Sequence, residues 1–368
     1  MNDISPETIA IFRRVAGQNT ETFVERDLEC LNYNSKVLVC ERNLRSWSIK
    51  VHTLELNRPK SILARILKWL QFDYYREFQI SRFFAKHEVK YALIHFLDYA
   101  VEVSPLLDKL GIPYIAIAHG YDASSKLRDP KYRSKLKNLQ SAKAIIVVSE
   151  ALKSNLADYG FEHPNTIVRP SSILIETFIP GCFRSRNTLL AVGRFVEKKS
   201  PFFLITMMWQ LRRIRPDIRM FFVGDGPLFD ATVELTKTLD ITRNIFFLGA
   251  QCNSLVIDLT KACGALVQHS VTTDSGDMEG FPAIMQEALS QGLPVVATKH
   301  SGIPEHIVDG VTGFCSQEYQ LENFVENVLK ILDLTETEYN IMSLRCAQYA
   351  KENFCYSKRS KLIDNAFS

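Results

Sequence analysis

The sequence predicts an α/β fold with two Rossmann-like, doubly wound parallel-sheet domains that face each other across a cleft. With 368 residues the chain is long enough for two domains of ordinary size. Short apolar runs alternate with helical patterns in both halves, which is typical of parallel sheets covered by helices. Both periodicities break once, near residues 170–187. We therefore expect domains over 1–175 and 176–345, and a C-terminal helix over 346–368 that returns to the first domain.

Ten apolar runs are the strand candidates. In the first half they are Lys36–Cys40, Tyr91–His95, Tyr114–Ala118, Ala144–Val148 and Thr166–Val168. In the second half they are Thr188–Val192, Met220–Val223, Ile245–Leu248, Ala265–Val267 and Leu293–Ala297. In such folds ligands bind at the carboxyl ends of the strands, so the segments that follow these runs are the candidate sites.

Composition narrows the class of protein. The chain is 46% apolar and 23% charged, with a net charge of +3, as in globular domains, and it gives no sign of a nucleic-acid partner. No run approaches the roughly 18–20 apolar residues of a membrane span, and the N-terminus lacks a signal-peptide pattern. The eight cysteines are scattered without a C-x-x-C pair, which indicates core thiols in a reducing compartment. We expect a cytoplasmic protein.

One stretch of the first half, Arg58 to Lys90, alternates basic and aromatic residues. As a helix it would carry a basic, aromatic face that could rest on an anionic membrane. The alternative is a pair of ordinary domain helices whose apolar stripes pack inward.

The most informative segment runs from Asp277 to Thr298 and holds two carboxylates, Glu279 and Glu287. Pro282 suits a first helical position and Gly292 a C-terminal stop, so Glu279 precedes a helix and Glu287 lies within it. The free N–H groups of the helix start between them suit a phosphate. This pattern predicts a site for a sugar–diphosphate–ribose ligand.

Two cations follow the first strand of the second half. Arg194 can grip phosphate oxygens through paired hydrogen bonds, and Lys199 adds a point charge, while we expect Lys198 to be solvated. A Gly-rich turn at Gly224 after another strand permits close backbone approach to a ligand.

For two further loops in this half we expect no direct part in the chemistry. The loop Asp274–Asp277 lacks a ligand cluster, so we assign no metal. His306 follows a Gly turn and Pro304, and we expect it to be structural.

Several spaced motifs together resemble the family-4 retaining glycosyltransferases of GT-B fold. The residues from His269 to Pro282 further resemble exopolysaccharide transferases of the colanic-acid and amylovoran type. The motifs are G-R-F-V-E-K-K (193–199), V-G-D-G-P (223–227), E-G-F-P-x4-E (279–287), G-L-P-V-V-A-T (292–298) and S-G-I-P-E (301–305).

The resemblance implies a role for each matching residue of the second half. Glu287 would accept hydrogen bonds from the ribose, and Glu279 from a hydroxyl of the donor sugar. Arg194 and Lys199 would hold the diphosphate, which makes a metal unnecessary. The backbone N–H groups of Gly280 and Phe281, and the turn at Gly224, would complete the nucleotide-sugar site.

The first half resembles the family less. His119-Gly-Tyr-Asp122 fits its H-G-x-D motif, which implies that His119 contacts the donor sugar and that Asp122 lies on the acceptor side. Thr20 and Glu21 match an acceptor-side S-E-T-F loop. Arg13-Arg14, where relatives have F-P, departs from the pattern, so acceptor specificity is not carried over. The C-terminal helix Tyr349–Phe367 should return to the first domain.

The sequence thus predicts a metal-independent, retaining transfer of a sugar from a UDP-, GDP- or ADP-sugar to a hydroxyl of a lipid-linked oligosaccharide or surface polysaccharide precursor. A nucleotide-sugar epimerase on the same fold and a non-catalytic sugar-nucleotide-binding subunit remain alternatives. A nicotinamide dehydrogenase is disfavoured, because the glycine fingerprint G-x-G-x-x-G is missing.

Overall fold

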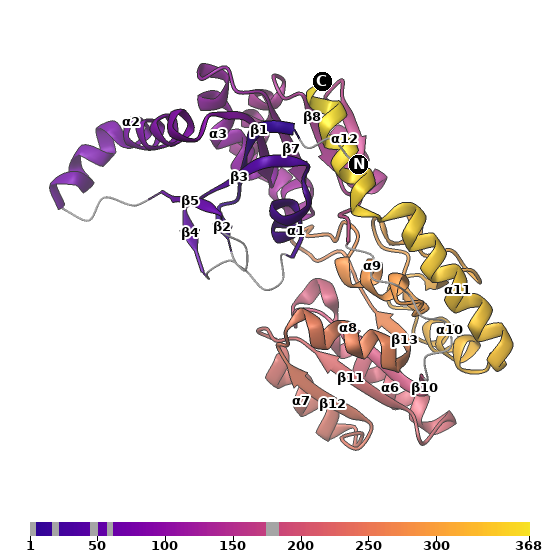
Figure 1. Cartoon of the computed structure of the whole chain (residues 1–368). Coiled ribbons are helices and arrows are strands. Elements are labelled where there is room, and N and C mark those ends of the chain that lie inside the picture. Colours follow the sequence, from indigo (N-terminus) through magenta and orange to yellow (C-terminus); the bar gives the residue numbers. More distant parts are fainter. Residues whose placement is uncertain (1–4, 17–21, 45–50, 57–61, 174–183) are drawn as a thin grey trace. The chain divides into compact units, whose positions relative to one another are not determined.

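The chain forms two compact units in a computed structural model that describes residues 5–16, 22–44, 51–56, 62–173 and 184–368 (Figure 1). The first unit holds the N-terminal part to Val148, Lys153–Arg169 and Tyr356–Ser368, and the second holds Ser149–Leu152 and Pro170–Cys355. The expected boundary at residues 175 and 176 lies outside the described residues.

The first unit is built on a parallel sheet with the order β5-β3-β1-β6-β7-β8-β9. Its strands are β1 Ser5–Phe12, β3 Tyr33–Cys40, β5 His52–Glu55, β6 Val89–His95, β7 Tyr114–Ala118, β8 Ala144–Val147 and β9 Thr166–Val168. A small parallel pair joins β2 Val15–Ala16 to β4 Arg42–Asn43. The helices are α1 Thr22–Cys30, α2 Ile62–His87, α3 Leu97–Lys109, α4 Pro130–Lys135, α5 Glu150–Asp158, whose first turn belongs to the second unit, and α12 Tyr356–Phe367.

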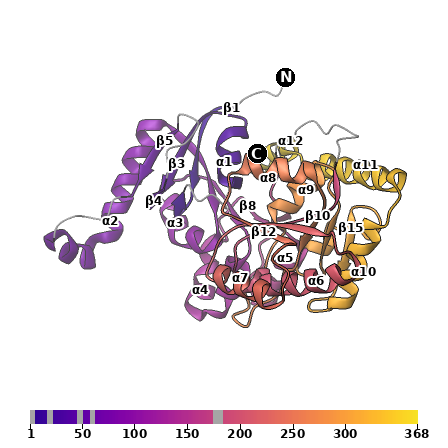
Figure 2. The ribbon, with the colours of Figure 1, turned by 90° about the horizontal axis from the view of Figure 1, so that it is seen from below.

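The second unit is built on a parallel sheet with the order β12-β11-β10-β13-β14-β15. Its strands are β10 Ser185–Val192, β11 Arg219–Val223, β12 Ile245–Gly249, β13 Cys263–Gln268, β14 Val295–Thr298 and β15 Gly313–Ser316. Its helices are α6 Pro201–Ile214, α7 Phe229–Thr238, α8 Asn253–Ala262, α9 Ala283–Ser290, α10 Leu321–Leu332 and α11 Glu336–Asn353. Helices α6, α7 and α10 cover one face of this sheet, and α8, α9 and α11 cover the other (Figure 2).

Both sheets have the order of a Rossmann fold, which confirms the predicted fold class. In each, the chain starts in the middle of the sheet, proceeds to one edge, and then returns to build the other half. The direction reverses between β1 and β6 in the first unit and between β10 and β13 in the second. Ligands bind beside such switch points, because the loops after the two central strands separate there.

All ten strand candidates are strands in the structure; Tyr114–Ala118 and Thr166–Val168 have the expected bounds, and the other eight differ at one end or both. Leu293–Ala297 begins later, as β14 Val295–Thr298. Strands β1, β5 and β15 of the two large sheets, and the two-residue strands β2 and β4, were not among the candidates. Strand β1 starts with the polar segment Ser-Pro-Glu-Thr, and β5 and β15 are four residues long, so their apolar signal is weak.

The C-terminal helix differs from its prediction. Instead of one helix over Tyr349–Phe367, helix α11 ends at Asn353 and α12 starts at Tyr356. The break is held by a backbone hydrogen bond from Ile173 to the Phe354 carbonyl (3.1 Å) and by the bridge between Ile173 and Cys355. Helix α12 belongs to the first unit and packs beside α1.

Helix α2 projects from the sheet of the first unit in both views (Figures 1 and 2). Ile80 and Phe84 are buried, and Phe84 contacts Phe12 of β1 edge to face, with ring centroids 5.9 Å apart. In the part of the chain that the structure describes, no helix is long and apolar enough to cross a membrane.

A pair of glycines offers a test of the packing of β15. Gly313 has φ 153°, and a Cβ there would lie 1.8 Å from the Val295 carbonyl oxygen, whereas a Cβ on Gly310 (φ 74°) would meet nothing within 4 Å. We expect Gly310→Ala to lower the free energy of unfolding by about 1 kcal/mol, through backbone strain alone. Gly313→Ala should lower it by about 3 kcal/mol or more, because β14 and β15 must separate. Urea denaturation measures both, and equal losses would contradict this packing.

Candidate functional site

The loop after β10 and the Gly-rich turn after β11 are joined backbone to backbone. Gly193 donates its N–H to the Val223 carbonyl (3.0 Å), and Phe195 donates to the Asp225 carbonyl (3.0 Å). A Cβ on Gly224 would lie 1.9 Å from the Gly193 carbonyl oxygen. The glycine is therefore required by the contact between the two loops, and a contact of Gly224 with a ligand stays a prediction.

The loops after β10 and β13 meet at the switch point of the second unit. Val271, beyond the end of β13, donates its N–H to the Lys198 carbonyl (2.9 Å). The next strand is tied in through Thr298, whose hydroxyl accepts from the Ser270 N–H (3.0 Å) and donates to the Ser270 carbonyl (2.6 Å). Residues far apart in the sequence are thereby brought together.

Two lysines and two carboxylates form a cluster at this junction. Lys199 Nζ lies 3.1 Å from Glu279 Oε1. Lys198 Nζ lies 3.1 Å from Asp277 Oδ2 and 3.8 Å from Glu279 Oε1. The expectation that Lys198 is solvated is wrong, because its side chain is only 23% exposed and is ion-paired. Asp277 likewise pairs with a lysine, a role that sequence reasoning missed.

The cluster keeps Glu279 ionised. Burial by itself would raise the pKa of this carboxyl, but the charges of Lys199 and Lys198 outweigh it and lower the pKa to about 2. Burial lowers the pKa of Lys199, and the attraction of Glu279 offsets this in part. An ionised carboxylate only accepts hydrogen bonds, so Glu279 can receive them from hydroxyl groups.

A histidine that the sequence did not single out holds the backbone of Glu279. His300 Nε2 accepts the Glu279 N–H (3.1 Å), and His300 Nδ1 lies 2.7 Å from Glu318 Oε1. Since the carboxylate accepts, the proton of the neutral ring belongs on Nδ1. No local pattern marks this pair, because the two residues follow different strands, β14 and β15.

Helix α9 carries Glu287, whose side chain is 5% exposed. Asn253, at the start of α8, donates a hydrogen bond from Nδ2 to Glu287 Oε1 (3.2 Å). Pro282 is the N-cap residue and not the first helical residue, a shift of one position, and Gly292 (φ 66°) follows the helix as expected.

The S-G-I-P-E turn supports the loop before α9. Gly302 donates its N–H to the Gly280 carbonyl (3.1 Å), and a Cβ there would lie 2.8 Å from that oxygen. The Phe281 ring is buried against His306, with centroids 4.5 Å apart, and His306 Nδ1 lies 3.2 Å from the Tyr349 hydroxyl. His306 therefore has a structural environment, and the orientation of the Gly280–Phe281 backbone is fixed.

Arg194 lies on the loop after β10 with an exposed side chain. Its guanidinium makes no hydrogen bond or ion pair with the described residues. It is close enough to Lys198 to act on its charge. The loop thus presents a cation for an anionic ligand, beside two lysines that already neutralise carboxylates.

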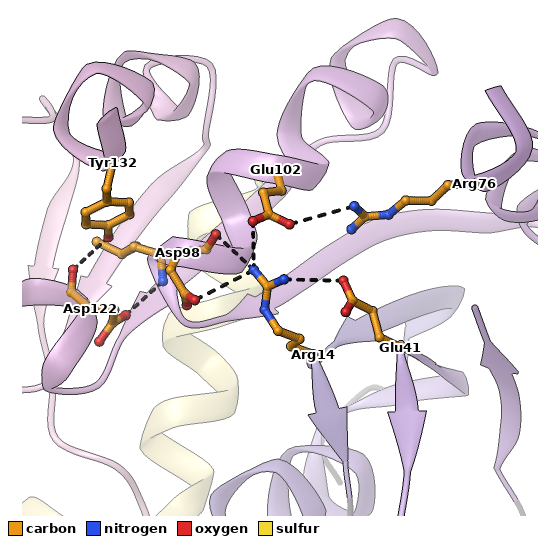
Figure 3. A network of polar contacts seen from close by, with 8 residues as sticks. Arg14, Glu41, Arg76, Asp98, Glu102, Asp122 and Tyr132 are labelled. Carbon is orange, nitrogen blue, oxygen red and sulfur yellow. Dashed lines mark hydrogen bonds and ion pairs between the residues drawn. The ribbon is translucent and has the colours of Figure 1, made fainter. Parts of the chain in front are cut away.

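In the first unit, His119 follows β7 and Asp122 lies three residues on. Asp122 Oδ1 accepts from the His119 and Gly120 N–H groups (3.0 and 2.9 Å), and Oδ2 accepts from the Leu97 N–H (2.8 Å). Tyr132 donates to the Asp122 carbonyl (2.7 Å; Figure 3). Burial raises the pKa of Asp122 to about 6, although these N–H groups oppose the shift. Asp122 is fully buried and shapes the loop that carries His119, and its place on the acceptor side stays a prediction.

A charged network occupies the carboxyl ends of β1, β3 and β6 (Figure 3). Arg14 points between three carboxylates, with nitrogen–oxygen distances of 3.4 Å to Glu41, 3.7 Å to Asp98 and 2.9 Å to Glu102. Arg76 of α2 lies 3.8 Å from Glu102. Sequence reasoning noted Arg14 only as a departure from the family pattern. Thr20 and Glu21, expected on the acceptor side, lie outside the described residues.

Metal-ligating side chains do not gather at either site: within the described ranges, no group of three or more His, Cys, Asp or Glu could hold a metal ion.

Two family models match the chain. Glycosyl transferases group 1 covers residues 176–353, and Glycosyltransferase Family 4 covers residues 37–172. Among curated relatives, the putative colanic acid biosynthesis glycosyltransferase WcaL of Escherichia coli is 24% identical over 65% of this chain. The amylovoran biosynthesis glycosyltransferase AmsK of Erwinia amylovora is 27% identical over 44% of it. These matches span 60% and 39% of the two relatives' own lengths.

Solved structures share the fold across the whole chain. Anabaena Alr3699/HepE in complex with UDP-glucose matches with a TM-score of 0.74 and 15% identity, over 98% of this chain and 99% of that one. Sucrose-phosphate synthase from Thermosynechococcus elongatus matches with a TM-score of 0.75 and 14% identity, over 98% of each chain. The fold and the two models together define a protein of the GT-B glycosyltransferase class. The chain belongs to glycosyltransferase family 4, which confirms the family that its motifs predicted.

The ionised state of Glu279 predicts a pH-dependent contribution to stability. Its folded-state pKa lies below the ordinary 4.5, so the stabilisation is complete above pH 4.5 and is lost as pH falls toward 2. We expect Glu279→Gln to cost about 2–3 kcal/mol in free energy of unfolding at neutral pH. The difference from wild type should shrink below pH 4.5. Urea denaturation between pH 7 and pH 3.5 measures it, and a difference that grows in acid would contradict the assignment.

Proposed function

We propose that the protein transfers a sugar from a nucleotide-diphosphate sugar to an acceptor hydroxyl. The observation that carries this proposal is the cluster of Lys198, Lys199, Asp277 and Glu279 at the switch point of the second unit, followed by α9 with the buried Glu287. A cationic loop, an ionised carboxylate and a helix start are the groups that such a donor needs.

In this proposal the cations of the site bind the diphosphate of the donor. As the bond to the sugar breaks, negative charge develops on the departing diphosphate, and groups already in place stabilise it most effectively. Arg194 offers a guanidinium that none of the described residues pairs with, and Lys199 carries a charge that a phosphate can share with Glu279. The N–H groups at the start of α9 add partial positive charge.

In this proposal the two glutamates accept hydrogen bonds from the two sugars of the donor, the transferred sugar and the ribose. Glu279 is ionised and 14% exposed, so it can accept a hydroxyl hydrogen bond from the transferred sugar. Glu287 lies on α9 and can accept from the ribose, with Asn253 holding one of its oxygens. We therefore propose that the diphosphate lies between them, beside the start of α9.

Retention of the anomeric configuration and independence of metal are further parts of the proposal, taken from the family resemblance. In the first unit, His119 is the residue that we propose to act on the donor sugar. The acceptor that we propose is a lipid-linked oligosaccharide or a surface polysaccharide precursor, and the similarity to glycosyltransferases of colanic acid and amylovoran biosynthesis supports it.

Similar proteins make two different nucleotides candidates for the donor, uridine and guanosine diphosphate. HepE binds UDP-glucose, while other relatives are GDP-mannose-dependent mannosyltransferases. An epimerase would convert a donor completely without an acceptor, and a non-catalytic subunit would bind the donor and leave it unchanged. Product analysis with and without acceptor separates the three.

Replacing Glu287 tests the donor site. A thermal-shift screen of UDP-, GDP-, ADP- and dTDP-sugars identifies the nucleotide that stabilises the wild-type protein, because binding favours the folded state. We expect Glu287→Gln to weaken the binding of that nucleotide sugar by about 10- to 100-fold, since a charge-assisted hydrogen bond to ribose is lost. Isothermal titration calorimetry gives the affinities.

The matched control is Glu326→Ala on α10, an exposed glutamate of the same unit, which should bind as the wild type does. Wild-type affinity in Glu287→Gln would remove the ribose assignment.

Membrane contact through α2 is a second part of the proposal. Tyr75 (47% exposed), Phe78 (60% exposed), Arg82 and Lys86 recur at helical spacing and share one exposed side, opposite the buried Ile80 and Phe84. Aromatic rings beside basic residues suit an anionic lipid surface. This favours a peripheral protein at the cytoplasmic face of a membrane, where a lipid-linked acceptor is available.

Vesicle co-sedimentation tests this contact. We expect the double variant Tyr75→Ser/Phe78→Ser to lose about tenfold or more in partitioning to phosphatidylglycerol-containing vesicles, because two aromatic side chains no longer insert. Phe202→Ser, which changes an exposed phenylalanine of the second unit (37% exposed), is the control and should leave partitioning unchanged. Equal partitioning of all three proteins would contradict the role of α2.

A further inference from the structure

A chain of buried polar groups runs through the first unit to His119. It begins at Asp27 of α1, which is 1% exposed. Asp27 Oδ1 accepts from Arg359 Nε (3.1 Å) and from the Tyr356 hydroxyl (2.8 Å), both on α12. Asp27 Oδ2 lies 3.1 Å from Arg359 Nη2 and 3.2 Å from His95 Nε2. The carboxylate is thus fixed from three sides.

The ionisation of this group follows from its partners. Burial alone would raise the pKa of Asp27, but Arg359 and His95 outweigh it and hold the pKa well below its usual range. The bidentate contact with Arg359 neutralises the carboxylate in the core. A buried ion pair of this kind costs much to break, so Asp27 stays ionised and in place.

The ionised carboxylate decides where His95 carries its proton. His95 ends β6 and is fully buried, and burial lowers its pKa, so the ring is neutral. A carboxylate can only accept, so the proton of His95 belongs on Nε2, which faces Asp27. Nδ1 of His95 is then an acceptor.

The accepting Nδ1 atom of His95 faces His119. His95 Nδ1 and His119 Nε2 are 3.1 Å apart, and the two rings are nearly parallel, at 21°. Since His95 Nδ1 accepts, His119 Nε2 must donate, and the proton of a neutral His119 ring belongs on Nε2. The other nitrogen, Nδ1, keeps its lone pair. Asp122 holds the His119 backbone, and Phe96 packs on its ring with centroids 4.5 Å apart.

We propose that Asp27, His95 and Arg359 are positioning residues that fix His119 in the tautomer with a proton on Nε2 and an accepting Nδ1. His119 would then accept a hydrogen bond from a substrate hydroxyl and would not donate one. This assignment of a substrate contact rests on the proposed function, whereas the tautomer itself does not. It also gives α12 a part in the site, because this helix supplies Arg359 and Tyr356.

Nitrogen-15 NMR of the full-length protein with labelled histidine tests the tautomer directly. Two-bond proton–nitrogen correlations distinguish a ring protonated at Nε2 from one protonated at Nδ1, and His119→Gln and His95→Gln assign the signals. We expect both rings to be neutral and protonated at Nε2 near pH 7. A wild-type His119 protonated at Nδ1 overturns the proposal, and the variants serve only to assign the two signals.

A pair of substitutions at His95 tests its effect on the reaction. Gln can donate to Asp27 and accept from His119, whereas Leu can do neither. We expect His95→Leu to lower kcat/KM roughly tenfold or more, with an unchanged KM for the nucleotide sugar, and His95→Gln to stay within about threefold of wild type. Equal loss in both variants, or no loss in His95→Leu, overturns the positioning role. If the wild-type protein transfers no sugar, the proposed function fails, and the NMR spectrum still decides the tautomer.

Discussion

The second unit depends on the electrostatic attraction between Lys199 and Glu279 where the loops after β10 and β13 meet. The parallel sheet brings these loops to one place, and the backbone bond from Val271 to Lys198 joins them. The two lysines lie on one loop and the two carboxylates on the other, so like charges repel within each loop. Pairing each carboxylate with a lysine of the other loop offsets this repulsion in a partly buried place. The neutralised junction then keeps Glu279 ionised, fixed through His300, and ready to accept. The geometry of the candidate donor site follows from that one junction.

The first unit also holds charged groups away from solvent, but by a different arrangement. Its polar groups are buried deeper, and the Asp27–Arg359 pair joins α1 to the last helix of the chain. From this pair a series of close polar contacts leads through His95 to His119, and Asp122 holds the backbone of the loop that carries His119. In both units a largely buried ion pair lies near, or includes, the residue that is proposed to meet substrate. The partly exposed charges around Arg14 form a separate network at the carboxyl ends of the strands.

The fold and half of the candidate site could be predicted from the sequence because their signals are local. Apolar runs marked ten strands, and the spacing of Glu279 and Glu287 around a helix start marked the two carboxylates for which we propose donor contacts. The residues that the sequence did not single out depend on long-range contacts. Lys198, His300 and Asn253 acquire their partners only when the sheet is assembled, as do Asp27 and His95. The burial of Asp122 could not be predicted either, because the motif gives residue types, whereas three backbone N–H groups surround this carboxylate only in the folded chain.

A double-mutant cycle of Lys199→Met and Glu279→Gln measures the central interaction most directly. The free energies of unfolding of wild type, both single variants and the double variant give the coupling between the two side chains. We predict a favourable coupling of about 2 kcal/mol at neutral pH, because the pair is largely shielded from solvent, with 15% and 14% of the side chains exposed. The exposed pair Glu234 and Lys237 on α7 should give less than about 0.5 kcal/mol in the same experiment. Additive losses at Lys199 and Glu279 would contradict the view that their attraction organises the site.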